Sequence, residues 1–194
     1  MAKQTIFIFL LCSCTLLSRA QLIGGLKGGL NANNIIVTNS QDFFAEADFT
    51  ARYSFHAGSF VRHSFSVHFA WQVEMLFSNK GVTIENSDLS EKISLNYLNW
   101  PLLIVYTPNK KFGIEAGLEP GFLISSEPRF NSFDLGMDVG ISYLIKQKWL
   151  TGIRYSQGFP FSMNPVDNIT EEDMPNYQHS ILQLYLGFNL IKEN

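Results

Sequence analysis

Seven charged residues are spaced along the chain so that their side chains could meet inside a fold and do chemistry. Five are acidic and two are basic: Glu74, Glu115, Glu119, Asp134, Asp138, Lys27 and Arg154. Paired carboxylates can act as general acid and base in hydrolysis. Charges enclosed in a protein must also be paired for structural reasons, however, and one arginine can bridge two acids. We therefore expect a structural polar network in the interior and no catalytic residue.

The motifs that the chain lacks also argue against catalysis. The sequence has no G-x-S-x-G, Walker or H-E-x-x-H motif, and no nucleophile has a convincing base beside it. The acidic segment 167–176 lacks the ordered spacing and the central glycine of a calcium-binding loop. We expect no enzyme activity, no cofactor and no metal ion.

Two histidines, His56 and His68, fall on the polar face of their stretches. A three-residue turn at 62–64 would pair Val61 with Phe65 and make the two histidines diagonal neighbours. No third ligand has a fixed spacing from them. The sequence therefore predicts hydrogen-bonded histidines rather than a metal site.

The charged residues lie in stretches where apolar and polar residues alternate, which is typical of β-strands. In FSVHFAWQVEMLFS (65–78), for example, Glu74 shares one face with His68 and Gln72. Such stretches occur at 21–31, 53–61, 65–78, 95–106, 112–124, 133–145, 149–156 and 182–190. Strands of roughly nine to fourteen residues suit a tilted crossing of a lipid bilayer and exceed the usual length in soluble sheets.

The connections and the glycines indicate which face of these strands is inside. Long connections alternate with tight turns, as they do in a barrel whose two rims face different compartments. The long ones are expected at 33–52, 79–93, 126–132 and 158–177, and the tight turns at 62–64, 107–111 and 146–148. Glycine is frequent on the polar face, where a narrow barrel needs small inward residues. The predicted fold is all-β, an eight-stranded antiparallel up-and-down transmembrane β-barrel with a filled polar lumen.

The first twenty residues have the pattern of a secretory signal peptide. Lys3 precedes an apolar run at 6–17, and Ser18-Arg19-Ala20 is a small-residue cleavage site. We expect cleavage near Ala20 and one barrel domain at 21–194. Removing Lys3 and Arg19 changes the formal net charge from −3 to about −5, so nucleic acid is not an expected partner.

Aromatic residues on the apolar face are expected to mark the edges of the lipid layer. Tryptophan and tyrosine favour the interface between lipid and water. The candidate interface residues are Trp71, Trp100, Tyr143, Trp149 and Tyr155.

Six segments occur in a characteristic order along the chain. They are KGGLN (27–31), QVEMLFS (72–78), LNYLNWPLLI (95–104), EAGLEPGFLIS (115–125), FDLGMDVGISY (133–143) and RYSQG (154–158). Together they resemble the PorT-like outer-membrane β-barrel family of Bacteroidetes-type bacteria. The resemblance implies an outer-membrane barrel that is exported by the Sec pathway and inserted by the barrel-assembly machinery. It implies little chemistry, since only the namesake is associated with protein secretion, gliding or protease export.

The chain departs from that family at two places. Asn99 and Val105 stand where the family often has Glu and Lys, so one inward charged pair is missing. Leu190 stands where the family has an aromatic residue at the C-terminal end, a position that bears on recognition by the assembly machinery.

Three classes of function remain open from the sequence. The first is an integral outer-membrane barrel, not a wide pore, with a structural or loop-mediated binding role. Lipid surrounds such a barrel, and loops 33–52, 79–93 and 158–177 are its expected contacts with protein partners. The second is an accessory component of a secretion or gliding machinery that acts through exterior loops. The third is a soluble periplasmic lipocalin-like barrel, which would need apolar residues inside and charges outside.

Overall fold

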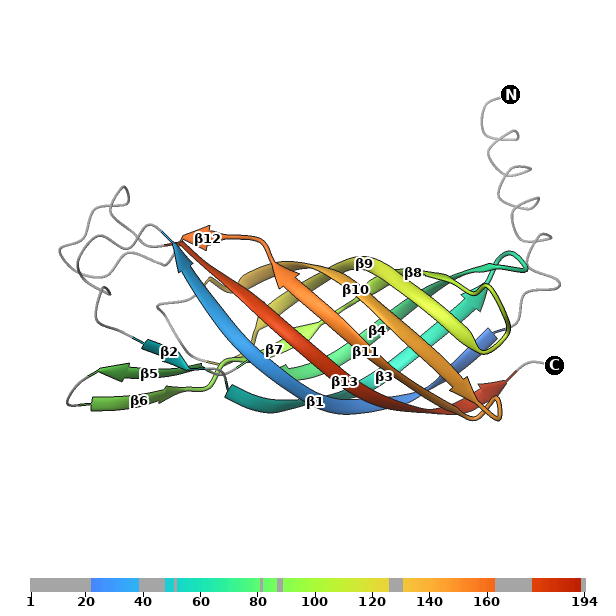
Figure 1. The fold of residues 1–194 in the computed structure, drawn as a ribbon, viewed down its shortest axis with the longest axis horizontal. Helices are drawn as coiled ribbons and strands as arrows, with labels where there is room; N and C mark the ends of the chain where they lie inside the picture. Colours follow the sequence, from blue (N-terminus) through green and yellow to red (C-terminus); the bar gives the residue numbers. More distant parts are fainter. Residues whose placement is uncertain are drawn as a thin grey trace, which may run out of the picture.

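The strands of this chain close into an antiparallel barrel (Figure 1). The structure is a computed structural model that describes residues 22–38, 48–50, 52–80, 82–86, 89–125, 131–162 and 176–192. Closure comes from the pairing of β1 (Leu22–Thr38) with β13 (Asn176–Lys192) along nearly their whole length. The predicted signal peptide lies outside the described residues and stays a prediction.

The wall between these two strands follows the order of the chain. It contains β3 (Arg52–Ser64), β4 (Phe69–Asn79), β7 (Asn96–Asn99), β8 (Leu102–Tyr106), β9 (Phe112–Leu123), β10 (Phe133–Ile145) and β11 (Trp149–Gly158). β7 and β8 pair with the same two neighbours and together form one wall strand. Within the described residues the barrel therefore has eight strands, and the predicted fold class is confirmed.

Proline separates β7 from β8, but the wall remains continuous there. Proline has no backbone N–H to donate, so Pro101 and Pro120 of β9 contribute only carbonyl groups. The amide of Glu74 donates to the carbonyl oxygen of Pro101 at 3.0 Å, and the amide of Trp100 donates to that of Pro120 at 2.8 Å. These two bonds keep the interrupted strand in register with both neighbours.

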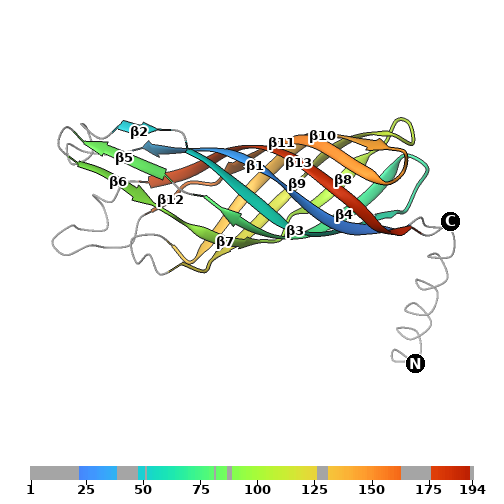
Figure 2. The same ribbon diagram turned by 90° about the horizontal axis from the view of Figure 1, so that it is seen from below.

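A small second sheet stands beyond one end of the barrel. β2 (Asp48–Thr50), β5 (Val82–Asn86) and β6 (Leu89–Ile93) pair antiparallel with β5 in the middle, and β12 (Phe161–Ser162) extends the wall beside β13. Figures 1 and 2 show these strands at the end opposite the start of β1 and the end of β13. The connection predicted as a loop at 79–93 is therefore largely a β-hairpin.

The alternation of each strand separates an outward apolar face from an inward polar one. In β4, Trp71 and Met75 are exposed, whereas Gln72, Glu74 and Ser78 are buried. A soluble lipocalin-like barrel would need the opposite arrangement, so that alternative is wrong. In the described part of the chain there is no helix long and apolar enough to cross a membrane.

The predicted turn at 62–64 is wrong. β3 continues to Ser64, and the chain reverses at residues 65–68, whose first two amides donate to the carbonyl oxygen of Phe69 at 3.1 Å. The physical reason is that 65–68 keeps the apolar and polar alternation of the strand that follows. Periodicity alone could not separate this turn from a strand.

The true turn changes the neighbours of the two histidines. His56 lies opposite Ser78, and its Nδ1 is 2.6 Å from Oδ1 of Asn31. His68 is exposed in the turn, so the expected pair of inward histidines is wrong. Among the described residues no group of three or more His, Cys, Asp or Glu side chains could hold a metal ion.

The turn between β10 and β11 has a strained backbone. Lys146 and Gln147 have φ angles of 50° and 58°, in the left-handed region that favours glycine and asparagine. The amide of Lys148 donates to the carbonyl oxygen of Ile145 at 3.0 Å and closes this short turn. This turn and the one at 107–111 lie where the sequence predicts them.

Replacing Gln147 by glycine should stabilise the barrel by about 1 kcal/mol, because glycine adopts the left-handed conformation without the clash of a Cβ atom. The measurement is the free energy of unfolding in urea, with the protein refolded in detergent. Lys148→Gly is the matched control, since Lys148 lies in the same turn outside the left-handed region and should lose stability on this change. If the two substitutions change the free energy of unfolding equally, the backbone at Gln147 is not strained.

Candidate functional site

Arg154 of β11 is the centre of a charged network in the barrel interior. Its side chain is fully buried. Nη1 and Nη2 donate to the two carboxylate oxygens of Glu74 at 3.0 and 2.8 Å, and Nη2 also donates to Glu115 at 2.8 Å. Bidentate, charge-assisted bonds of this kind are stronger than neutral ones. They tie β11 to β4 and β9 across the lumen.

Lys27 and Tyr185 complete the surroundings of these two acids. Lys27 Nζ lies 2.9 Å from both oxygens of Glu74 and 3.6 Å from the ring centroid of Tyr185. The Tyr185 hydroxyl donates to Glu115 at 3.0 Å. Gly152 makes room for the ring, because a Cβ atom there would meet the Tyr185 hydroxyl. A larger residue at 152 would therefore displace the ring on which Lys27 rests.

Arg62 of β3 is a further cation of this network, which sequence reasoning missed. Its Nη2 donates to Glu115 at 2.8 Å and its Nε donates to Oε1 of Gln72 at 2.5 Å. The predicted turn at 62–64 hid this residue. The signal that could have found it is parity, since Arg62 has the same even spacing as the inward His56.

A second cluster of ion pairs lies toward the end of the barrel that carries the small sheet. Lys80 follows β4 and places Nζ 3.1 Å from both Glu119 and Asp134. The Asn99 amide donates to Glu119 at 2.8 Å, so Asn99 is part of this cluster. Sequence reasoning missed Lys80 because it assigned 79–93 to a loop, although Lys80 continues the inward alternation of β4.

The structure places all seven charged residues predicted for the network inside the barrel, each at most 3% exposed. Asp138 is held less closely than the others, at 3.8 Å from Nη1 of Arg154, beyond hydrogen-bond distance. With Arg62 and Lys80, the described interior contains five carboxylates and four cations. The charges are nearly balanced, as a lumen shielded from water requires.

A small apolar cluster lies in the interior toward the end opposite the small sheet. Phe60, Leu150 and Tyr185 are buried against one another, and Ile23 and Leu144 pack beside them. Phe60 is an apolar residue at a position where alternation puts polar ones. Part of the charged network thus borders packed apolar groups.

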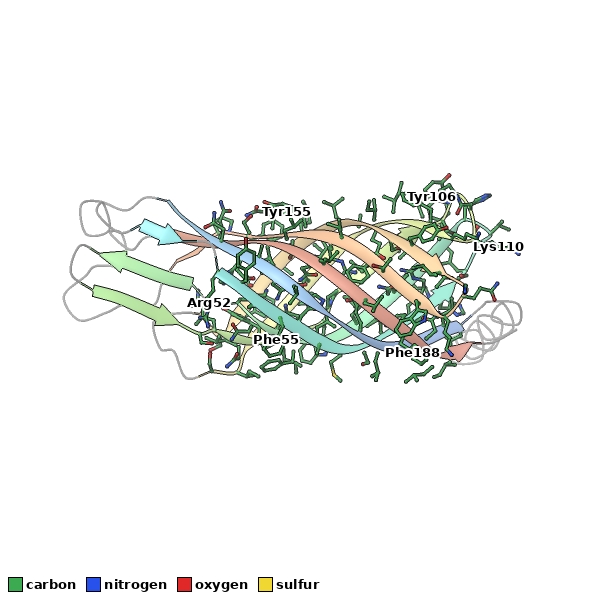
Figure 3. The ribbon with its side chains drawn as sticks, turned by 60° about the horizontal axis from the view of Figure 1, so that its bottom comes forward. Arg52, Phe55, Tyr106, Lys110, Tyr155 and Phe188 are labelled. Carbon is green, nitrogen blue, oxygen red and sulfur yellow. The ribbon has the colours of Figure 1, made fainter. Side chains whose placement is uncertain are left out.

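The five predicted interface aromatics lie on the outer side of the wall. Four are between 38% and 45% exposed: Trp71, Tyr143, Trp149 and Tyr155. The fifth, Trp100, is half-buried and packs edge-on against Phe122 at 5.3 Å. Figure 3 shows Tyr155 and Phe55 on the outside of the barrel. Their role as lipid anchors stays a prediction.

Comparison with known proteins concerns both sequence and fold. A family model described as outer membrane protein beta-barrel domain matches residues 19–162. No curated protein has a significantly similar sequence.

Several solved structures share the fold. The crystal structure of Ail from Yersinia pestis in complex with the heparin analogue sucrose octasulfate is 11% identical, with coverage of 88% of this chain and 99% of that chain and a TM-score of 0.50. The crystal structure of OprG from Pseudomonas aeruginosa is 14% identical, with coverage of 88% and 95% and a TM-score of 0.49. At such identities the likeness concerns the fold alone.

Replacing Arg154 by alanine should cost about 3 to 5 kcal/mol of stability, because Glu74 and Glu115 would lose the guanidinium that compensates their buried charges. The measurement is the free energy of unfolding by urea in a neutral detergent. The unfolded fraction is read from gels, on which unfolded protein migrates more slowly than folded protein. Lys111→Ala removes an exposed cation and should change stability by less than about 0.5 kcal/mol. Unchanged stability of the Arg154 variant would show that the network does not hold the barrel.

Proposed function

We propose that this protein, which belongs to the outer membrane protein β-barrel family, is a closed barrel that acts through its exterior loops. The observation that carries the proposal is the filled interior. Arg154, Glu115, Gln72 and Asn99 come from four different strands and have no exposed surface. An eight-stranded barrel is just wide enough for side chains to fill it. A rigid, impermeable wall leaves the connections at its outer end as the parts that can recognise a partner.

The exterior end supports this proposal by its shape and charge. The small sheet of β2, β5 and β6 extends beyond the barrel at this end. In the sequence, the segments 33–52, 79–93, 126–132 and 158–177 together contain more acidic than basic residues. An excess of acidic residues in these segments favours basic partners and disfavours polyanions. A polyanion such as the sulfated sugar in the Ail complex is therefore not an expected ligand of this protein.

We further propose that the chain is a PorT-like member of the family and serves a secretion or gliding machinery. Six segments in the family's order support this assignment, from 27–31 to 154–158. Under this second hypothesis, the same exterior connections contact a protein of the secretion or gliding machinery. Export by the Sec pathway, cleavage near Ala20 and insertion by the barrel-assembly machinery belong to the proposal.

The closed barrel predicts no ion conductance. Folded protein inserted into planar bilayers should give no reproducible current steps, because ion pairs and apolar side chains occupy the cross-section. Folding is checked by the faster gel migration of unboiled protein. Steps of constant size in independent preparations would contradict a closed lumen.

Loop-mediated binding predicts contacts at one end of the barrel only. A photo-crosslinking residue at Ser90 in β6 should give protein adducts in living cells, whereas one at Asn109 in the opposite turn should not give the same adducts. Mass spectrometry identifies them, and adducts with secretion or gliding proteins would support the PorT-like role. Absence of adducts from Ser90 and from the other exterior connections would contradict binding through this end.

A further inference from the structure

Two tight turns place four lysines at the rim opposite the small sheet. The turn 107–111 carries Lys110 and Lys111, and the turn 146–148 carries Lys146 and Lys148. All four side chains are exposed. In the part of this rim that the structure describes, no residue is acidic.

The two turns form one continuous surface, which we call the basic rim and define by these four lysines. The amide of Leu144 donates to the carbonyl oxygen of Lys111 at 2.7 Å, which joins the first turn to the strand that leads into the second. The amide of Asn189 donates to the carbonyl oxygen of Lys148 at 2.9 Å and joins the second turn to β13. The lysines thus gather on one part of the rim, from β8 to β13.

The first turn has a fixed shape that holds its lysines in place. The Asn109 side-chain oxygen accepts hydrogen bonds from the amides of Lys111 at 3.0 Å and Phe112 at 2.8 Å. In the second turn Lys146 keeps the left-handed conformation described above, at a position where asparagine or glycine would be less strained. Lysine therefore occupies this position against the local preference of the backbone.

Aromatic residues lie next to the lysines of the basic rim. Phe112 follows Lys111, and Trp149 follows Lys148; Lys148 Nζ lies 5.2 Å from the ring centroid of Phe188 on the outer wall. Figure 3 shows Lys110 and Tyr106 together at this end. Aromatic belts lie at the level of lipid headgroups, so the ammonium groups just beyond them reach the level of the phosphates.

We propose that the basic rim binds anionic phospholipid headgroups of the leaflet that faces the periplasm. Barrels of this class have their short turns on the periplasmic side. Because these turns are short, their side chains stay close to the membrane surface, where the lipid headgroups lie. Lysine ammonium groups at headgroup depth attract anionic lipid. The remaining turn, 65–68, carries exposed Phe65 and Val67 and no acidic or permanently basic residue, so the binding is confined to one side of the barrel.

Electron spin resonance with spin-labelled lipids tests this proposal. The protein is reconstituted in phosphatidylcholine bilayers with a trace of spin-labelled phosphatidylglycerol or phosphatidylcholine, and the association constants of the two are compared. One basic residue near a membrane can favour an anionic lipid by at most about fivefold. We expect the natural rim to prefer phosphatidylglycerol at least about twofold, and 1 M salt should reduce this preference because it screens exposed charges.

Variants locate the preference on the rim. Lys110→Gln with Lys148→Gln should lower the preference for phosphatidylglycerol, and adding Lys111→Gln and Lys146→Gln should bring the ratio close to one. Arg52→Gln with Lys92→Gln removes two charges at the exterior end and is the matched control for the double rim variant. Faster migration of unboiled protein shows that each variant is folded.

Two results would overturn the proposal. One is equal association of both lipids with the unmodified protein at low salt. The other is a preference that the control pair lowers as much as the double rim variant does. If the fourfold variant does not fold, the double variant and the salt dependence of the unmodified protein still decide between these outcomes.

Discussion

The pairing of buried charge inside a narrow barrel is the constraint on which the rest of this structure depends. Lipid covers the outside, so the strands turn their apolar residues outward and their polar residues inward. The inward carboxylates cannot all reach water, and each needs a cation. Arg154 meets Glu74 and Glu115, while Lys80 meets Glu119 and Asp134. These contacts cross the lumen, so they connect strands on opposite sides of the barrel and fill its interior.

The closed barrel that we propose limits the ways in which the protein can act. Transport through the centre would require the ion pairs to separate in a medium of low dielectric constant, where unpaired charges are costly. Recognition at the two rims needs no such change. The rims differ in form: one carries a small sheet, and the other carries short turns with lysines. We infer that a polar partner at the outer end and lipid headgroups at the inner end are the natural contacts.

The sequence predicted well which side chains of each strand face inward, but it predicted the register between neighbouring strands poorly. Strict alternation was enough to put Glu115, Glu119 and Asp138 on the inward side, because each side chain's face depends only on its parity. Register depends on where a turn begins, and residues 65–68 alternate like the strand behind them. Because of this ambiguity, the sequence did not predict that Arg62 lies inside the barrel. Lys80 was missed for another reason. The strands extend beyond the lipid layer, and polar residues occur there on both faces of a strand. The alternation of apolar and polar residues that predicts a strand is therefore absent.

The coupling between Arg154 and Glu74 tests the central claim most directly. A double-mutant cycle with Arg154→Met and Glu74→Met, measured as free energies of unfolding in neutral detergent, isolates the interaction of this bidentate pair from its other neighbours. If the network closes the barrel, the two residues should show a favourable coupling of about 1.5 to 3 kcal/mol. A coupling near zero in folded variants would contradict the account, since the barrel would then be held by its backbone ladder alone.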